Sequence, residues 1–248
     1  MKTDPIIEKA LSNGQNALSE HESKILLEKY DVPITREFLV ASAEEAVKAA
    51  SELGYPVVLK ACGWKITHKT ERNLVAVGIK NDNEVREAFE TITRNLEGED
   101  SEGILVQEMV KGSRELAIGL VRDPQFGPCV MFGLGGIFTE ILRDTSFRVA
   151  PINVDDAYQM MEDIKAKKIL ESIRGMAPAN REKLARALVG LGRLGLEQNY
   201  ISEVDVNPLI LTQEGEPVAV DALVILASGE NKKIIQDPAG EKFKKGKT

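Results

Sequence analysis

A β-hairpin near the C-terminal end of the chain carries polar residues among aliphatic ones. Its first strand contains Glu203, Asp205 and Asn207, separated by Val204 and Val206. Side chains alternate between the two faces of a strand, so the three polar residues share one face and the valines pack on the other. The pattern is typical of an amphipathic hairpin with a solvated face, and equally of a polar face that binds a hard cation.

The turn of this hairpin predicts which residues lie opposite one another. If residues 213–215 form a three-residue loop with Gly215 in the left-handed conformation, Thr212 pairs with Glu216. The same register places Asn207 opposite Asp221. Cross-strand neighbours lie about 5 Å apart, close enough for one carboxamide and one carboxylate to share a magnesium ion. Asn207 and Asp221 are therefore the predicted metal ligands.

Composition excludes several classes of protein. Of the 248 residues, 43% are hydrophobic and 29% charged, as in an ordinary globular protein. The net charge of -7 argues against a general nucleic-acid binder, which needs a basic face to neutralise phosphates. Two cysteines, Cys62 and Cys129, imply no disulfide framework. Without an apolar run of membrane-spanning length, we expect a cytoplasmic protein with no membrane or nucleic-acid partner.

Caps, apolar spacing and turn residues indicate mixed helices and strands, an α+β chain. Asp82 is expected to cap a helix from Glu84 to Leu96, and residues 155–174 and 180–194 are expected to be helical. The polar segment from Gly98 to Gly103 is a plausible seam between subdomains. The expected division is an N-terminal helix (1–18), a first subdomain (19–103), a second subdomain (104–227) and a mobile polar tail (228–248).

Three segments carry residues suited to phosphate chemistry. Lys60 ends an aliphatic strand, where it either bridges phosphates or simply marks the strand end. His68, in the next loop, is either a phosphoryl acceptor or a solvated side chain. The glycine loop with Gly133, Gly135 and Gly136 permits close backbone approach, so its amides can cradle a phosphoryl group, although a flexible turn gives the same pattern.

Two further segments are ambiguous in the same way. The strand containing Gln107, Glu108 and Val110 is either a hinge whose backbone pairs with an adenine edge or an ordinary core strand. Arg148, which follows the glycine loop and Glu140, either neutralises a terminal phosphate or is a solvated strand residue.

Taken in order, the motifs resemble those of one family, the ATP-grasp β subunits of ADP-forming acetate–CoA ligases, also called NDP-forming acyl-CoA synthetases. These subunits are related to the succinyl-CoA synthetase β subunit. The resemblance spans about residues 6 to 227 and rests on Lys60, His68-Lys-Thr, Gln107-Glu108, Lys111-Gly-Ser-Arg-Glu115-Leu, Gly133-Leu-Gly-Gly-Ile-Phe-Thr-Glu140, Ser146-Phe-Arg-Val-Ala-Pro151, Glu203-Val-Asp-Val-Asn-Pro208 and Asp221.

The resemblance implies an ATP-grasp fold of two subdomains that hold ATP or ADP and Mg²⁺ between them. It implies a CoA-binding α subunit that carries the main phosphohistidine, in a heterotetramer of two α and two β subunits. The overall reaction is acyl-CoA + ADP + phosphate giving acid + CoA + ATP. The roles implied are catalytic for His68, Asp205 and Arg148, nucleotide-binding for Lys60, Gln107, Glu108, Val110, Glu115, Gly135, Gly136 and Glu140, and metal-binding for Asn207 and Asp221.

The sequence departs from this family after His68. The family pattern has an acid, one residue and two glycines, whereas this chain reads Glu71-Arg72-Asn73-Leu74, which restricts the backbone of the loop. Two other functions stay open at this point. A carboxylate–amine ligase would use the same nucleotide grip but needs a substrate domain after Ala227, and a non-catalytic nucleotide-sensing subunit would tolerate the altered loop.

Overall fold

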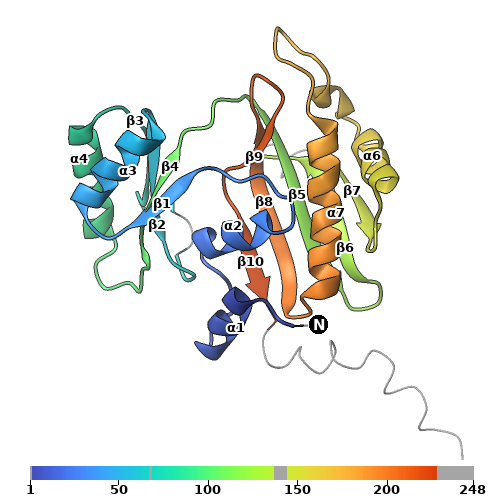
Figure 1. Ribbon diagram of the computed structural model, residues 1–248, viewed down its shortest axis with the longest axis horizontal. Coiled ribbons are helices and arrows are strands. Elements are labelled where there is room, and N and C mark those ends of the chain that lie inside the picture. Colours follow the sequence, from blue (N-terminus) through green and yellow to red (C-terminus); the bar gives the residue numbers. More distant parts are fainter. Residues whose placement is uncertain (1, 67–68, 137–143, 228–248) are drawn as a thin grey trace, which may run out of the picture.

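The computed structural model describes residues 2–66, 69–136 and 144–227, which form two units joined side by side (Figure 1). The helices are α1 (Pro5–Ser12), α2 (Glu20–Glu28), α3 (Ala43–Leu53), α4 (Asp82–Asn95), α6 (Val154–Asp163) and α7 (Arg181–Glu197), with a 3₁₀ helix η1 (Lys167–Leu170). The strands are β1 (Glu37–Val40), β2 (Val57–Cys62), β3 (Val75–Ile79), β4 (Gly103–Glu108), β5 (Arg114–Asp123), β6 (Gly127–Leu134), β7 (Thr145–Val149), β8 (Ile201–Leu211), β9 (Pro217–Ala219) and β10 (Leu223–Leu226).

The smaller unit is an antiparallel four-stranded sheet with strand order β1-β4-β2-β3. Helices α3 and α4 cover one of its faces (Figure 1). Their apolar stripes meet the sheet in a core of aliphatic side chains that runs from Val40 to Val106. Each helix begins at a side-chain cap: Ser42 accepts from the Glu45 amide, and Asn81 accepts from the Glu84 amide.

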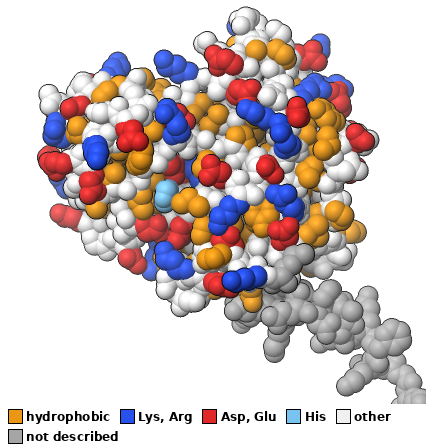
Figure 2. Space-filling model, in the orientation of Figure 1, with side chains coloured by type: hydrophobic (Ala, Val, Ile, Leu, Met, Phe, Trp, Pro, Cys, Tyr) orange, Lys and Arg blue, Asp and Glu red, His pale blue; other side chains and the backbone are white. Residues whose placement is uncertain are grey.

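The larger unit is an antiparallel sheet with strand order β10-β8-β5-β6-β7, with β9 beside β8. Helices α6 and α7 pack on one face, and α2 lies between this unit and the smaller sheet (Figure 1). The opposite face carries Asp205 in a cross-strand row with Leu223, Gly119, Met131 and Phe147. Figure 2 shows basic and acidic side chains interspersed over the visible surface of both units.

The hairpin has the expected register. Gly215 has φ +83°, its amide donates to the Thr212 carbonyl, and the Thr212 amide donates to the Glu216 carbonyl. Leu209 pairs with Ala219 and Leu223 with Asp205, which is one continuous register on both sides of the predicted metal-ligand pair. Continuing that register through the gap places Asn207 opposite Asp221, and the expected arrangement of the hairpin is confirmed.

The long helix expected over residues 155–174 was predicted wrongly. Helix α6 ends at Asp163, and η1 follows after a break. The side chain of Asp144, which precedes α6 in the chain, explains the break. Its two oxygens accept the amides of Lys165 (2.8 Å) and Ala166 (2.7 Å), which therefore bond to Asp144 and not to helical carbonyls. The cap of α4 also differs from expectation, because Asn81 occupies the cap position and Asp82 the first turn.

The point where the chain leaves the smaller sheet does not coincide with the seam expected at residues 98–103. β4 pairs with β2 along its whole length and belongs to the smaller sheet, which the chain leaves after Glu108. Helix α2 packs through Leu26 and Leu27 into the larger core. The smaller unit is thus inserted between α2 and β5, and the subdomain limits 19–103 and 104–227 stay predictions. Among residues 2–66, 69–136 and 144–227, no helix is long and apolar enough to cross a bilayer.

Two glycines of α7 give a matched test of this packing. A Cβ on Gly190 would lie 1.7 Å from the Tyr30 carbonyl oxygen, whereas a Cβ on Gly192 would meet side chains at ordinary distances of 3.4 Å and more. We expect Gly190→Ala to lower the free energy of unfolding by about 2 kcal/mol, because α7 must separate from the end of α2. Gly192→Ala gains helix propensity and should raise it by up to about 1 kcal/mol. Urea unfolding of both variants measures the difference, and equal stabilities would contradict the close contact.

Candidate functional site

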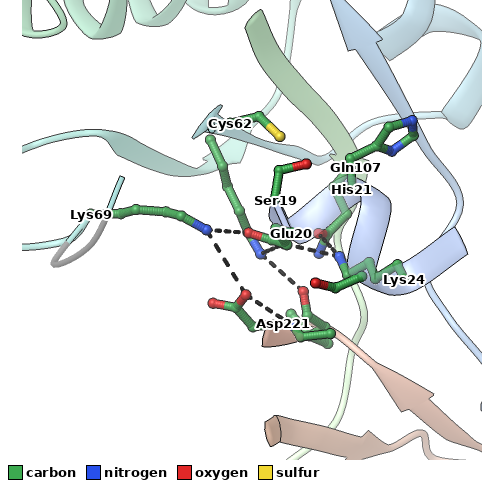
Figure 3. Close-up of polar contacts among 12 residues, drawn as sticks. Ser19, Glu20, His21, Lys24, Cys62, Lys69, Gln107 and Asp221 are labelled. Carbon is green, nitrogen blue, oxygen red and sulfur yellow. Dashed lines mark hydrogen bonds and ion pairs between the residues drawn. The ribbon is translucent and has the colours of Figure 1, made fainter. Parts of the chain in front are cut away.

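A buried ionic cluster lies where the smaller sheet, α2 and the end of the hairpin meet (Figure 3). Its centre is the carboxylate of Glu20, in the first turn of α2. One carboxylate oxygen accepts from Lys24 at 3.0 Å and from Lys60 at 2.8 Å, and the other accepts from Lys69. The Glu20 side chain is only 2% exposed, so three ammonium groups share one carboxylate almost out of water.

Lys24 is fixed from several sides. Besides Glu20, it donates to the Thr35 hydroxyl at 3.1 Å, to Glu37 at 2.8 Å and to the Gln107 amide oxygen at 2.8 Å. These partners come from α2, β1 and β4, so Lys24 ties the helix to the smaller sheet. Its side chain has no solvent exposure.

Lys60 and Lys69 connect the cluster to the hairpin of the larger unit. Lys60, on β2, also donates to the Val220 carbonyl at 2.9 Å. The Lys69 ammonium lies 3.9 Å from a carboxylate oxygen of Asp221. Two cations from the smaller unit therefore reach the end of the hairpin that carries the predicted metal ligands.

The charges in the cluster support one another. Burial by itself raises the pKa of Glu20, but the charges of Lys60, Lys24 and Lys69 outweigh it and hold the pKa well below the ordinary value. Burial lowers the pKa of Lys69, but the charges of Glu20 and Asp221 raise it overall. Burial likewise opposes the charge of Lys24, which Glu20 and Glu37 stabilise, so that its pKa is also raised. Glu20, Lys24 and Lys69 are therefore ionised at neutral pH.

The polar face of the hairpin is acidic. Val204 and Val206 are buried, as expected, and Asp205 is exposed on the opposite face of β8. Desolvation by the surrounding protein, followed by the charges of Glu203 and Asp221, raises the pKa of Asp205 to about 6. Burial and the charge of Glu20 raise the pKa of Asp221, although Lys60 and Lys69 oppose them. This face therefore carries an excess of negative charge that a cation would relieve.

The glycine loop lies against this face. The Gly136 amide donates to the Asn207 side-chain oxygen at 2.9 Å, and the Gly135 amide donates to the Glu115 carbonyl at 2.9 Å. A Cβ on Gly135 would lie 2.3 Å from the Leu116 carbonyl oxygen, and one on Gly136, where φ is +59°, would lie 1.7 Å from the Glu115 carboxylate. Only glycine fits both positions. The structure thus brings Glu115, Gly135, Gly136 and Asn207 together.

The segment expected to act as a hinge follows the edge of the cluster. Gln107 is fully buried, and its amide nitrogen has no partner among the described residues. Glu108 accepts from the backbone and side chain of Arg36, each at 2.9 Å, and Val110 is half-buried just beyond β4. Gln107 is therefore part of the lysine cluster, and base recognition by this segment stays a prediction.

Arg148 is not brought to the site. It lies opposite the buried Val130, on the face of the larger sheet that α6 and α7 cover, and its guanidinium pairs with Asp163 at 2.5 Å. Its neighbour Phe147, not Arg148, shares the face of Asp205. His68 and Glu140 were also expected at the site, and both lie outside the described residues.

Sequence reasoning missed Glu20, Lys24 and Lys69 as site residues. Glu20 and Lys24 stand in a helix whose start is already explained by Ser19, which accepts the Glu22 amide. The available signal was their spacing of four residues, which places an acid and a base on one face of a helix that also needs an apolar face.

The residues present fit a nucleotide with its magnesium ion. Asn207 and Asp221 offer two hard oxygen ligands, and Mg²⁺ takes one or two protein ligands and completes its shell with water and phosphate oxygens. Among the described residues no group of three or more His, Cys, Asp or Glu side chains is arranged to hold a metal. Lys60 and Lys69 supply the opposing positive charge that phosphates need.

Comparisons with known proteins show the family of this chain. The ATP-grasp domain model matches residues 9–226. The β subunit of ADP-forming acetate–CoA ligase I from Pyrococcus furiosus is 47% identical over 229 residues, covering 91% of this chain and 98% of the relative. The corresponding β subunit of ligase II from that organism is 41% identical over 227 residues, covering 89% and 96%.

A solved structure supports the same assignment. The acetyl-coenzyme A synthetase 1 of Ca. Korarchaeum cryptofilum, in complex with coenzyme A, Ca-AMPCP and HgCl⁺, matches with a TM-score of 0.85 and 45% identity, covering 90% of this chain and 98% of that chain. A second structure of that synthetase contains coenzyme A and Mg-AMPPCP, with a phosphohistidine segment pointing towards the nucleotide-binding site.

The predicted α+β fold and the predicted family are therefore confirmed. This chain belongs to the ATP-grasp family, among the β subunits of ADP-forming acetate–CoA ligases.

Proposed function

We propose that this chain is the nucleotide-binding β subunit of an ADP-forming acyl-CoA synthetase. It transfers a phosphoryl group between a phosphohistidine and ADP or ATP, within the reaction acyl-CoA + ADP + phosphate giving acid + CoA + ATP. The observation that carries the proposal is the convergence of Lys60 and Lys69, from the smaller unit, on the Asp221 end of the hairpin. Cations and metal ligands then face the same phosphates from two sides.

The described residues of the site position the phosphoryl group and neutralise its charge. Lys60 and Lys69 attract the phosphate oxygens, and the Gly136 amide orients the side-chain oxygen of Asn207. Mg²⁺ bound to Asn207 and Asp221 would neutralise negative charge as the phosphoryl group moves. Asp205, whose pKa is about 6, is ionised at neutral pH and can accept the free N–H of an incoming phosphohistidine ring.

The phosphohistidine comes from a partner. The relatives from P. furiosus are named as β subunits, which implies a separate α subunit. In Archaeoglobus fulgidus, the matching region is 33% of a longer ADP-forming acetate–CoA ligase I chain. We infer a CoA-binding α subunit and a heterotetramer of two α and two β subunits. A second phosphoryl relay through His68 stays a prediction of the family resemblance.

The first prediction concerns this division of labour. We expect the purified chain to bind Mg-ADP but to make no acyl-CoA until an α subunit is added, because His21, the histidine among the described residues, is paired with Glu37 at 2.9 Å and the visiting phosphohistidine is inferred to come from the partner. Calorimetry measures nucleotide binding, and a coupled assay over a panel of carboxylic acids measures synthesis with and without the co-expressed partner. Rapid acyl-CoA synthesis by this chain alone would contradict the proposal.

The second prediction concerns the metal ligands. Asn207→Ala and Asp221→Asn should each weaken ADP binding about tenfold or more in the presence of Mg²⁺, because they remove a metal ligand. Binding of ADP in the presence of EDTA should change little. Glu203→Gln, on the same face of β8, is the matched control. Mg²⁺ should increase its affinity for ADP as much as it does that of the wild type. If the control variant lost as much affinity as the other two, the metal would not be bound by this pair.

The third prediction follows from the raised pKa of Asp205. The folded protein holds the Asp205 proton up to about pH 6, above the ordinary value of 3.8, so ionisation destabilises the fold increasingly as the pH rises between these values. Asp205→Asn should raise the free energy of unfolding at pH 7.5 by about 1 kcal/mol, a value reduced by solvent screening. At pH 3.5, where both side chains are neutral, the gain should vanish. Urea unfolding at both pH values measures it, and a destabilised variant at pH 7.5 would show that the raised pKa is wrong.

A further inference from the structure

Lys69 lies between the carboxylate of Glu20 and that of Asp221, the proposed metal ligand. Lys69 contacts a carboxylate oxygen of Glu20, whereas its distance to Asp221 is 3.9 Å. Lys60 likewise donates to Glu20 and to a backbone carbonyl, with no bond to the Asp221 carboxylate. The ion pair of Lys69 with Asp221 is therefore longer than its ion pair with Glu20, and in Figure 3 the Lys69 ammonium group lies between Glu20 and Asp221.

The alternative partner for Lys69 is Asp221 itself. The side chain of Asp221 is 44% exposed, and among its side-chain oxygens one accepts from the Ala222 amide at 3.0 Å. An ammonium group seated on this carboxylate would compete with Mg²⁺ for the same lone pairs. A buried carboxylate such as that of Glu20 competes well with an exposed one for a lysine, because water no longer hydrates its charge.

Lys24 is held more firmly than the other two lysines. Besides Glu20 it donates to Thr35, Glu37 and Gln107, and it makes no bond to Asp221. The movable members of the cluster are therefore Lys60 and Lys69, and both are restrained by Glu20.

We propose that Glu20 is a positioning residue that draws Lys69 and Lys60 away from Asp221, so that Asp221 stays available to the nucleotide-bound magnesium ion while both lysines stay beside the phosphates. The inference rests on the proposed function, because it assumes Mg-nucleotide at this site. It assigns a role to a residue that touches neither nucleotide nor metal and acts through the two lysines.

The fourth prediction concerns the increase in ADP affinity that Mg²⁺ provides. We expect Glu20→Gln to reduce this increase by a factor of about ten, in the range found for residues that orient metal ligands. The measured quantity is the ratio of the ADP dissociation constants with EDTA and with Mg²⁺, from calorimetry on the full chain. Glu22→Gln is the matched control, because Glu22 lies in the same helix but pairs with Lys9 and makes no bond to the cluster. It should keep the wild-type ratio.

The fifth prediction is a specific rescue. In the Glu20→Gln background, Lys69→Met removes the cation that would move to Asp221, and the magnesium ratio should return to within about threefold of wild type. Absolute ADP affinity should stay low, because a phosphate-facing charge is lost. Lys24→Met in the same background should give no rescue, since Lys24 does not reach Asp221.

The outcomes separate this inference from the proposed function. A wild-type chain that does not bind Mg-ADP would remove the proposed function. A wild-type chain that binds it, with Glu20→Gln keeping the full magnesium ratio, would overturn the role of Glu20 alone, as would equal rescue by Lys24→Met and Lys69→Met. Should Glu20→Gln fail to fold, Glu20→Asp retains the charge on a shorter side chain, and a ratio unchanged from wild type in that folded variant would also count against the proposal.

Discussion

The carboxylate of Glu20 and the three lysines around it connect helix α2, the smaller sheet and the end of the hairpin. Helix α2 belongs to the larger core, Lys60 to the smaller sheet, and the carbonyl that Lys60 reaches belongs to the hairpin end. A charge taken out of water is tolerated only when its partners are in place. The relative position of the two sheets is therefore coupled to the satisfaction of these charges, and the acidic face of β8 is held opposite the lysines as a result.

The balance of charge explains why such a cluster is stable before any ligand arrives. Glu20, Glu37 and Asp221 oppose Lys24, Lys60 and Lys69, so the lysines are neutralised within the protein. Phosphates that enter the site take over part of the pairing that these carboxylates give to the lysines. Less new charge therefore has to be removed from water than if the lysines were exposed. The binding surface is preorganised in the sense that its cations are already desolvated and oriented.

Much of the fold could be predicted from local signals. The hairpin register followed from Gly215 and the alternation around Asp205, because both depend on residues close in sequence. The break after α6 could not be predicted, since it depends on Asp144, whose contacts with the Lys165 and Ala166 amides are tertiary. Glu20 was missed for a related reason: the cap at Ser19 already explained that segment. For Arg148 the motif indicated a role in phosphate binding, but the strand places its side chain on the helix-covered face.

The first and last parts of the described fold are neighbours. Ala17 forms a β-bridge with Ile225, and the Leu226 amide donates to the Asn16 carbonyl at 2.8 Å. Both lie on the larger unit, at the β10 edge of its sheet, whereas the smaller unit is inserted in the middle of the chain. Adding polypeptide at either end would therefore leave the insertion undisturbed. This topology makes the fold portable as a module, and it offers a physical reason why the same region forms one third of a single longer chain in A. fulgidus and almost the whole of a separate subunit in P. furiosus.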